Sequence, residues 1–323
     1  MNDLAAAIMS ETEHLNLAPK KQEEEAAQLS EIQIKLTQDT IKKMMSAGPK
    51  TCLAFSGGSD SLVLLDMIRE FEPKPIVIWA DSQMEYPETR EYIKQTVSDL
   101  GFELGIAQAD RTPMEQWCKT GWPMLGKMAA RLWMQKNKDA GFRINVSECC
   151  RNMKIAPARK LTRLFGCGIQ LTGQRGQADD NLRGLRNKKD RLMSYQQRDQ
   201  IWIGNPLDGW TDGEIRAYKE SRNLPIHPKI KAGAKTIGCV YCGGGSQYTN
   251  SGYRVLRRTW PEAWRRFMCE WGAGLIVLAL KYKTTLQETI AAVQHIGGLE
   301  SLAIARPWVF DFTRKTPLPG YDK

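Results

Sequence analysis

The sequence has no apolar run long enough to span a lipid bilayer. Its longest candidate is Ala273–Leu280, whereas a membrane-spanning helix needs roughly 20 apolar residues. The amino terminus also lacks the pattern of an export signal, because Met1–Ser10 is mixed in character and Glu11–Glu25 is rich in Glu, Lys and Gln. We therefore expect a cytoplasmic protein without a membrane partner, in which the eight cysteines serve as thiols or metal ligands rather than disulfides.

Histidine is scarce, and the sequence shows no internal repeat. His14, His227 and His295 are scattered, and none is paired with a Ser or Cys in a recognisable triad, so we expect structural roles for all three. Positive charge is in excess: 46 Lys and Arg stand against 36 Asp and Glu, which gives a net charge of +10. This balance fits either a solvated cationic surface or attraction to the phosphates of nucleotides or nucleic acid.

Short apolar runs alternate with segments of helical spacing through the middle of the chain. This alternation predicts an α/β domain whose parallel sheet has helices on both faces. We place this domain at residues 48–228, after a helical extension at 1–47 and before a mainly helical, cysteine-containing region at 229–323. Gln177–Gln200 is polar and densely charged, and we expect a mobile surface loop there. The expected strands are 51–55, 75–80, 102–107, 168–172 and 201–205, and the expected helices are 62–71, 87–100, 117–139, 152–165 and 211–221.

A glycine-rich turn joins the first expected strand to the first expected helix. Its glycines allow backbone N–H groups to approach an anion, its serine hydroxyls add donors, and the amino end of the helix adds a positive dipole. The turn predicts a cradle for nucleotide phosphates, with an ordinary tight turn as the alternative. It lacks the Lys of a Walker A loop, which disfavours hydrolysis at the γ-phosphate. The predicted nucleotide-binding residues are Ser56, Gly57, Gly58, Ser59, Asp60 and Ser61.

Asp81 follows the next expected strand, at the edge of the sheet where open α/β folds bind ligands. Together with Asp60 it would help to hold Mg²⁺ on the phosphates of ATP, because hard cations prefer carboxylates. The alternative is that Asp81 caps a turn or a helix.

Four ordered segments between about residues 50 and 245 resemble motifs of known proteins. Ser56–Ser61 resembles the PP-loop of the adenine-nucleotide α-hydrolase fold, and Asp81–Thr89 resembles a segment of the phosphoadenosine phosphosulfate (PAPS) reductase family. The resemblance implies a PP-loop fold that binds nucleotide phosphates, with Arg175 near the anion. The two further segments that resemble this family are Thr172–Arg175 followed by Asp179-Asp180, and Asn205–Leu207 followed by Trp210–Asp212.

Four cysteines form two pairs, Cys149-Cys150 and Cys239-x-x-Cys242. Paired thiolates suit an iron–sulfur cluster or zinc, and adjacent cysteines are awkward ligands for one tetrahedral zinc. The pattern resembles that of sulfonucleotide reductases with a [4Fe–4S] cluster, and Lys154 follows the first pair as a Lys does in that family. The resemblance implies that all four cysteines bind such a cluster. Purely structural cysteines are the alternative. We expect buried, structural roles for Cys52, Cys118 and Cys167.

The reductases carry a further Cys in a carboxy-terminal Glu-Cys-Gly-x-His segment, which attacks the sulfonucleotide sulfur. In this sequence no Cys follows Cys269, so we expect that covalent step to lack its nucleophile. A nucleotide loop and a cluster without that Cys resemble the DNA phosphorothioation proteins of the DndC and SspD type. Those proteins are PAPS reductase relatives that cleave ATP to AMP and pyrophosphate and help to put sulfur into the DNA backbone.

Two stretches, at 183–198 and 254–266, are rich in cations, and the second interleaves them with Trp. Cations for phosphates beside aromatic rings for bases form a pattern typical of nucleic-acid binding. The alternative is a solvated loop and a helix packed by its Trp residues. The predicted nucleic-acid-binding residues are Arg183, Arg186, Lys188, Lys189, Arg257 and Arg258.

From these features we predict an ATP pyrophosphatase that adenylates the DNA backbone for sulfur insertion. The predicted catalytic residues are Asp60, Lys154 and Arg175, and the two cations would neutralise charge at the α-phosphate. The predicted partners are ATP with Mg²⁺, DNA, a cysteine desulfurase or another sulfur donor, and other proteins of the modification system. The alternatives are a sulfonucleotide reductase, a tRNA-thiolating enzyme, and a nucleic-acid-binding protein that keeps the nucleotide fold as a sensor.

Overall fold

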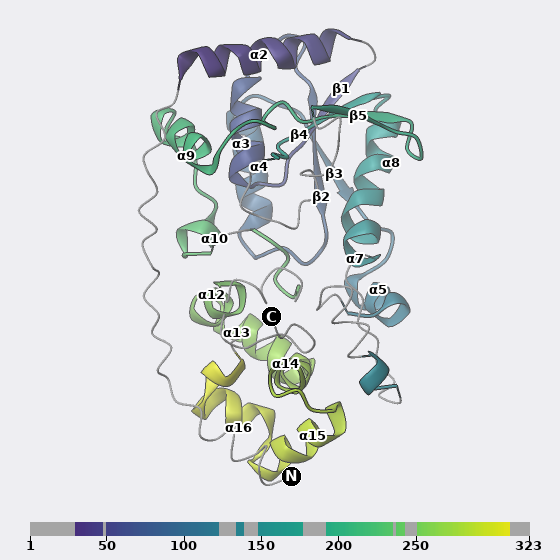
Figure 1. The fold of residues 1–323 in the computed structure, drawn as a ribbon, viewed down its shortest axis with the longest axis vertical. Coiled ribbons are helices and arrows are strands. Elements are labelled where there is room, and N and C mark those ends of the chain that lie inside the picture. Colours follow the sequence, from purple (N-terminus) through teal and green to yellow (C-terminus); the bar gives the residue numbers. More distant parts are fainter. Residues whose placement is uncertain are drawn as a thin grey trace. The chain divides into compact units, whose positions relative to one another are not determined.

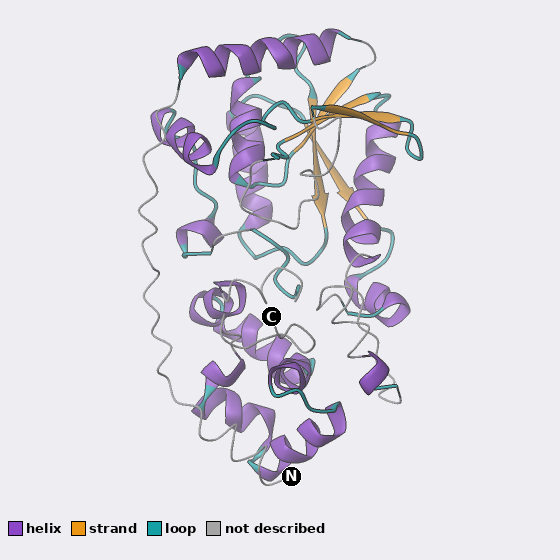
Figure 2. Ribbon diagram, viewed as in Figure 1, coloured by secondary structure: helices purple, strands orange, loops and turns teal. Residues whose placement is uncertain are grey.

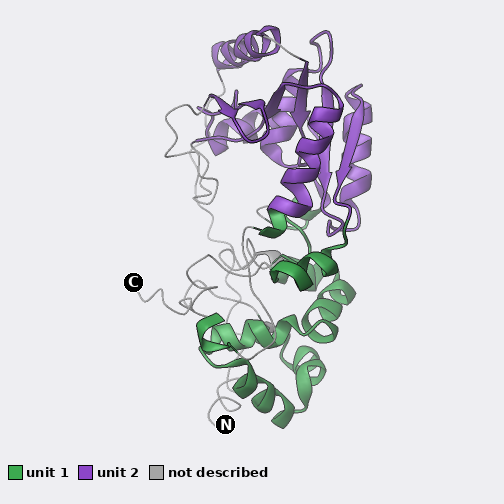
Figure 3. Ribbon diagram, turned by 90° about the vertical axis from the view of Figure 1, so that its right-hand side faces the viewer, with its two compact units in different colours: residues 1–21, 111–150, 229–323 green, residues 22–110, 151–228 purple. Residues whose placement is uncertain are grey.

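The computed structural model describes residues 30–47, 50–122, 134–138, 148–176, 192–234, 237–242 and 251–310. The chain divides into two compact units (Figure 3). Unit 1 comprises Met1–Lys21, Arg111–Cys150 and Lys229–Lys323, and unit 2 comprises Gln22–Asp110 and Arg151–Pro228. In the described ranges, none of the helices combines the length and the apolar character needed to cross a membrane.

Unit 2 is built on a six-stranded sheet with the order β3-β2-β1-β4-β6-β5. Neighbouring strands from β3 to β6 run parallel, and β5 runs antiparallel to β6. With helices on both faces of the sheet, as Figure 2 shows, this arrangement confirms the predicted α/β fold. The strands are β1 (Thr51–Ala54), β2 (Ile76–Asp81), β3 (Leu104–Gln108), β4 (Ile169–Thr172), β5 (Met193–Gln196) and β6 (Ile201–Gly204).

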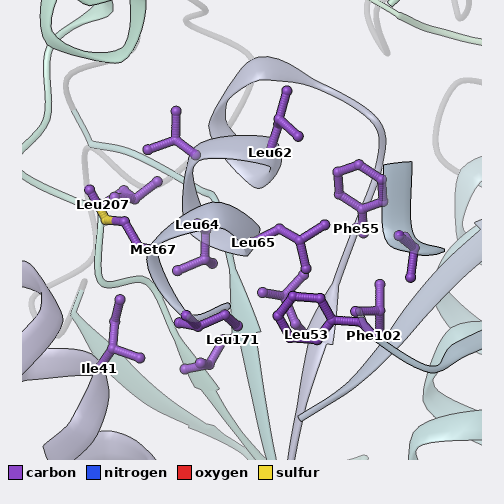
Figure 4. Close-up of a cluster of buried hydrophobic side chains, with 14 of the residues drawn as sticks. Ile41, Leu53, Phe55, Leu62, Leu64, Leu65, Met67, Phe102, Leu171 and Leu207 are labelled. Carbon is purple, nitrogen blue, oxygen red and sulfur yellow. The ribbon is translucent and has the colours of Figure 1, made fainter. Parts of the chain in front are cut away.

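The two faces of the sheet bury different side chains because successive residues of a strand point in opposite directions. On β1, Leu53 belongs to the larger apolar cluster, which helices α2, α3, α4 and α9 complete, and Cys52 belongs to a smaller cluster completed by α8. Figure 4 shows side chains of α3, among them Leu64 and Leu65, over Leu53 and Leu171 of the sheet. Each fully buried side chain of this size contributes about 1.5–3 kcal/mol. These helices are α2 (Glu31–Ser46), α3 (Ser59–Met67), α4 (Thr89–Asp99), α8 (Ala156–Leu164) and α9 (Asp212–Ser221) (Figure 1).

One strand contradicts the sequence-based expectation. The interval Gln177–Gln200 was predicted to be a mobile loop, but β5 occupies its later part and pairs with β6. Tyr195 of β5 packs against Trp202 of β6, with ring centroids 5.1 Å apart. Such cross-strand aromatic pairs stabilise two neighbouring strands even where one face is open to solvent. The prediction was wrong here because a half-exposed edge strand carries polar residues like those of a loop. Residues 177–191 lie outside the described part of the chain.

The helix expected at 117–139 is interrupted at residues 121–122, and its positions 123–133 and 139 lie outside the described residues. The helix α5 (Pro113–Thr120) begins after Thr112, which forms a capping box with Glu115, and it ends at Gly121, where φ is 93°. The Thr-Pro start and the glycine stop follow the ordinary capping rules. The helix expected at 152–165 begins as a π-helical turn, η1 (Arg151–Ile155), before α8.

Unit 1 is helical in its described parts. The apolar run noted in the sequence forms α14 (Ala273–Lys281), whose residues from Ile276 to Leu280 are all buried, so it is a central helix of this unit. The remaining elements of this region are α5, α7 (Glu148–Cys150), α10 (Pro228–Lys231, whose first residue closes unit 2), α12 (Ser251–Thr259), α13 (Pro261–Arg265), the π-helical η2 (Arg266–Glu270), α15 (Leu286–His295), α16 (Gly298–Ala305) and the 3₁₀ turn η3 (Pro307–Phe310).

Candidate functional site

The strand order places a topological switch point between β1 and β4. From β1 the chain builds β2 and then β3 on one side, and it continues on the other side with β4 and β6. Parallel strands end at the same edge of a sheet, and the carboxyl edge at such a switch point is where open α/β sheets bind ligands. Ser56–Gly58 follows β1, and Gly173–Arg175 follows β4. Both predicted motifs therefore lie at this switch point.

The loop after β1 is held in shape by its own hydroxyl groups. Gly57 has a φ of 78°, in the left-handed region that favours glycine. The Ser61 hydroxyl donates to the carbonyl of Gly58 at 3.0 Å, and it lies 3.2 Å from the hydroxyl of Ser56. The helix α3 begins at Ser59 and has no side-chain cap at Gly58. Its first N–H groups consequently lack intrahelical acceptors and are suited to bind an anion.

Gly173 brings the segment after β4 against this loop. A Cβ atom at Gly173 would lie 2.6 Å from the backbone N of Ser61 and 2.7 Å from the backbone C of Asp60. These atoms belong to the first turn of α3 and cannot move aside like the end of a side chain. Glycine is therefore required here by close approach of two backbones.

The side chain of Arg175 is buried, and all three of its guanidinium nitrogens lie close to other groups of the protein. Its Nη1 donates to the carbonyl of Trp210 at 2.9 Å, its Nη2 pairs with Asp212, and its Nε lies 3.2 Å from Oδ2 of Asp60. Burial acts against the charged form, but Asp60 and Asp212 outweigh it and hold the pKa of the guanidinium above its ordinary value. Arg175, predicted to meet the anion, lies in a position that fixes Asp60 and the start of α9.

Lys219 of α9 is a residue of this site that sequence reasoning missed. Its Nζ donates to the hydroxyl of Ser59 at 2.9 Å, at the first turn of α3. No motif contains Lys219, and it follows a capping box by several residues in an ordinary charged helix. The sequence therefore contains no signal that would single out Lys219, because only the packing of α9 against α3 brings its side chain to the first turn of α3.

Asp81 lies at the end of β2 with its side chain 2% exposed. It accepts hydrogen bonds from the backbone N–H of Gln83 at 2.8 Å and from Nε2 of Gln108 at 2.7 Å, and it pairs with Arg90. Its carboxylate thus stabilises the turn after β2. This is the alternative role predicted from the sequence for Asp81, as a residue that caps a turn or a helix. We attribute no magnesium contact to Asp81.

Lys154, on the π-helical turn η1, pairs with the loop that follows β2. Its Nζ lies 3.0 Å from Oε1 of Glu85, which also accepts from the hydroxyl of Ser82 at 2.7 Å. Burial acts to raise the pKa of Glu85, but the charge of Lys154 and the hydrogen bonds from Ser82 hold it below its ordinary value. The Lys154 side chain is 31% exposed, so it keeps access to solvent while it is paired.

Comparison with known proteins bears on this region. The model of the phosphoadenosine phosphosulfate reductase domain family matches residues 50–244. The chain belongs to this family. A PAPS reductase from Xylella fastidiosa (strain 9a5c) is 27% identical over 189 residues, covering 58% of this chain and 70% of the relative. An adenosine phosphosulfate (APS) reductase 2 from Bacillus subtilis (strain 168) is 26% identical over 197 residues, covering 60% and 73%. A crystal structure of PAPS reductase from Candida auris matches with a TM-score of 0.45 and 21% identity over 66% of this chain and 97% of that one.

The PAPS reductase domain includes both cysteine pairs, which lie in unit 1. Cys149 is buried and Cys150 is exposed on α7, while Cys239 and Cys242 are half-buried in a turn closed by the Cys242 N–H and the Cys239 carbonyl at 3.4 Å. Among the described residues, which include all four cysteines, no group of three or more His, Cys, Asp or Glu side chains is arranged to hold a metal ion. The described positions therefore do not form a ready-made cluster site, and we derive no chemical step through one.

Two of the remaining predicted cysteine roles match the structure and one does not. Cys52 and Cys167 are buried, as expected for small hydrophobic residues, but Cys118 is exposed on α5. The prediction for Cys118 was wrong because Cys118 lies one turn after the exposed Met114, on the solvent-facing side of α5, whereas the buried side carries Gln116.

The predicted nucleic-acid residues lie only partly in the described chain, and two of the six fall beyond the PAPS reductase domain. Arg257 and Arg258 are in the last turn of α12, after residue 244, and Arg258 donates to the carbonyl of Ala232. The others, Arg183, Arg186, Lys188 and Lys189, lie outside the described residues.

Proposed function

We propose that the chain binds an adenine nucleotide through the loop Ser56–Ser61 and acts on the group attached to its α-phosphate. The observation that supports this most directly is the loop itself. It combines a bend at Gly57, an amino-terminal helix turn without a side-chain cap, and a place at the switch point of a parallel sheet. Membership of the PAPS reductase domain family supports the same assignment.

A sulfonucleotide is the substrate that we place first. The relatives named above are APS and PAPS reductases, and their substrates carry a sulfo group on the α-phosphate. Two thiol groups of an external reductant would cleave that bond, releasing sulfite and the nucleoside phosphate while they are oxidised to a disulfide. Lys154 would supply positive charge near the departing group, because it keeps solvent access beside Glu85.

An ATP pyrophosphatase is the second candidate, and Asp60 favours it. A carboxylate in an anion-binding loop repels a bare phosphate, whereas a metal-bound triphosphate brings its own cation. Asp60 is 15% exposed and pairs with Arg175 through one carboxylate oxygen. In nucleotide sites Mg²⁺ is bound by one or two carboxylates together with substrate phosphates, so the carboxylate of Asp60 would suffice as the protein's ligand. The bound ion would neutralise charge on the leaving pyrophosphate.

Under this second candidate, the acceptor oxygen displaces pyrophosphate from the α-phosphorus and becomes adenylated. We keep the DNA backbone as the proposed acceptor, with tRNA as the alternative, and a cysteine desulfurase or another donor as the sulfur source. The support is the combination of a nucleotide loop and paired cysteines without a carboxy-terminal Cys, which resembles DNA phosphorothioation proteins, and the cations Arg257 and Arg258 of α12.

A substrate panel separates the candidates. Anaerobically purified protein is given APS or PAPS with reduced thioredoxin, or ATP and Mg²⁺ with and without duplex DNA or tRNA, and sulfite and pyrophosphate are measured. Sulfite supports the reductase, pyrophosphate supports the adenylating enzyme, and stimulation by one nucleic acid identifies the acceptor. Failure of every nucleotide to bind in calorimetry would overturn the proposal.

The same panel tests the loop. Asp60→Asn is expected to lower ATP turnover by about 100-fold or more, because it removes the carboxylate that would hold Mg²⁺ on the phosphates. The control is Asp110→Asn, which alters a carboxylate of the same unit that is 92% exposed. Equal turnover of the Asp60 and Asp110 variants would place the reaction elsewhere.

We further propose that the two cysteine pairs bind an iron–sulfur cluster. Both pairs belong to unit 1, and metal binding is coupled to local folding where a site forms only with its metal. Iron and acid-labile sulfide are expected in the anaerobic wild-type protein and in Cys118→Ser, but to be strongly reduced in Cys239→Ser. Wild-type protein without iron after anaerobic reconstitution would contradict the proposal.

A further inference from the structure

The ammonium group of Lys219 lies half-buried beside the nucleotide loop with a neutral partner. Its Nζ donates to the Ser59 hydroxyl at 2.9 Å. In the described part of the chain no carboxylate forms an ion pair with it. Burial lowers the pKa of Lys219, and the nearby charge of Asp60 offsets this only in part. The side chain therefore holds a positive charge and spare N–H donors in a place that does not fully solvate them.

The position of Lys219 is set by the packing of α9 on α3. The neighbouring residue Tyr218 is buried, and its hydroxyl donates to Oδ2 of Asp66 in α3 at 2.8 Å. The amino end of α9 is held by the Thr211–Glu214 capping box and by the ion pair of Asp212 with Arg175. Because both ends of the helix are fixed, Lys219 is directed to the first turn of α3.

This arrangement is electrostatically unfavourable without an anion. The amino end of a helix carries a partial positive charge, and cations are stabilised at the opposite end. Lys219 contacts the amino end of α3, where Asp60 is already paired with Arg175. A lysine side chain is long enough to extend into solvent, so its placement here needs a compensating interaction. A negatively charged ligand in the loop would provide it.

We propose that Lys219 binds the tetrahedral oxyanion attached to the α-phosphate of the substrate. This group is the sulfo group of a sulfonucleotide or the β-phosphoryl group of ATP, and both are tetrahedral and carry anionic non-bridging oxygens. The inference rests on the proposed function, because it assumes that the loop Ser56–Ser61 binds a nucleotide. It adds a contact that distinguishes nucleotides with such an outer group from AMP, which lacks it.

The test is calorimetric binding of AMP, APS, ATP and pyrophosphate to the full chain and to Lys219→Gln. In this variant the affinity for the substrate, whether APS or ATP, is expected to fall about 10-fold or more, as for loss of a charge-assisted hydrogen bond. The affinity for AMP is expected to change less than about 2-fold. Lys219→Arg, which keeps the charge, is expected to retain most of the preference over AMP. Arg216→Gln, which removes a cation from another position of the same helix, is the control for a general loss of positive charge.

The outcomes separate this inference from the function on which it rests. An equal loss of affinity for AMP and for the outer-group nucleotides in Lys219→Gln would overturn the role of Lys219, and so would a loss matched by Arg216→Gln. In both cases the loop would remain a nucleotide site. If the wild-type protein binds none of the four ligands, the proposed function itself fails. Thermal unfolding of each variant shows whether it is folded before its affinity is compared.

Discussion

Replacing Gly173 with Ala is expected to reduce nucleotide affinity by about 100-fold or more. The added Cβ would lie 2.6 Å from the backbone N of Ser61, 2.7 Å from the backbone C of Asp60 and 2.9 Å from the carbonyl O of Asp60. All three atoms belong to the main chain at the start of α3, so the clash is relieved only if β4's following segment or the loop moves. Either movement takes the N–H groups away from the phosphates, and a shift of about 1 Å in a binding constellation is costly. Overpacking of this kind also destabilises a fold by about 1–3 kcal/mol.

The matched control is Gly209→Ala. Gly209 lies in the segment after β6, and an added Cβ there would meet no atom within 4 Å. Calorimetric affinity for ATP and APS, together with the free energy of unfolding from urea titration, is measured for both variants. Wild-type affinity in Gly173→Ala would show that the first turn of α3 does not bind the ligand.

Replacing Arg175 with Met is expected to lower the free energy of unfolding by about 3–5 kcal/mol. The guanidinium is 5% exposed and satisfies the carbonyl of Trp210 together with the carboxylates of Asp60 and Asp212. Its removal leaves buried acceptors and two carboxylates without their cation, which is the costly way to break a buried ion pair. Nucleotide turnover should fall as well, since Asp60 loses the group that holds it in the loop.

The comparison variant is Arg265→Met. Arg265 also pairs with two carboxylates, those of Glu270 and Glu300, but it is 47% exposed, and surface pairs of this kind contribute little. Its unfolding midpoint is expected to stay near that of the wild-type protein. Adding Asp212→Asn to Arg175→Met should recover part of the lost stability, because one unpaired charge is removed. If the two arginine variants unfold alike, the buried network does not support the loop.

Much of unit 2 could be predicted because its signals are local. The apolar runs that became β1 and β2 are continuous, as expected for strands buried on both faces. The conformation of the Ser-Gly-Gly turn could be predicted because glycine at position 57 readily adopts a positive φ, which is 78° in the structure. The alternation of strand and helix then gave the parallel sheet and its switch point.

The details of the site depend on contacts between distant segments, and these leave no local pattern. Arg175 was expected near the anion, yet Asp212 and Trp210, more than thirty positions along the chain, occupy its donors. Lys219 reaches the loop only because Tyr218 fixes α9 to α3. The strand β5 was missed because its stability comes from pairing with β6 rather than from its own composition.

The place of β1 in the sheet has a consequence for synthesis on the ribosome. β1 pairs with β2 on one side and with β4 on the other, through Cys52 opposite Ile76 and Gln170. A nascent chain that has emerged as far as Gln108 contains all of β1, β2 and β3 but no part of β4. The inner edge of the future sheet is then open, and unpaired strand edges template association between chains. Slow translation through the interval before Ile169 would therefore lengthen the period in which this edge of β1 is open to pairing with another chain.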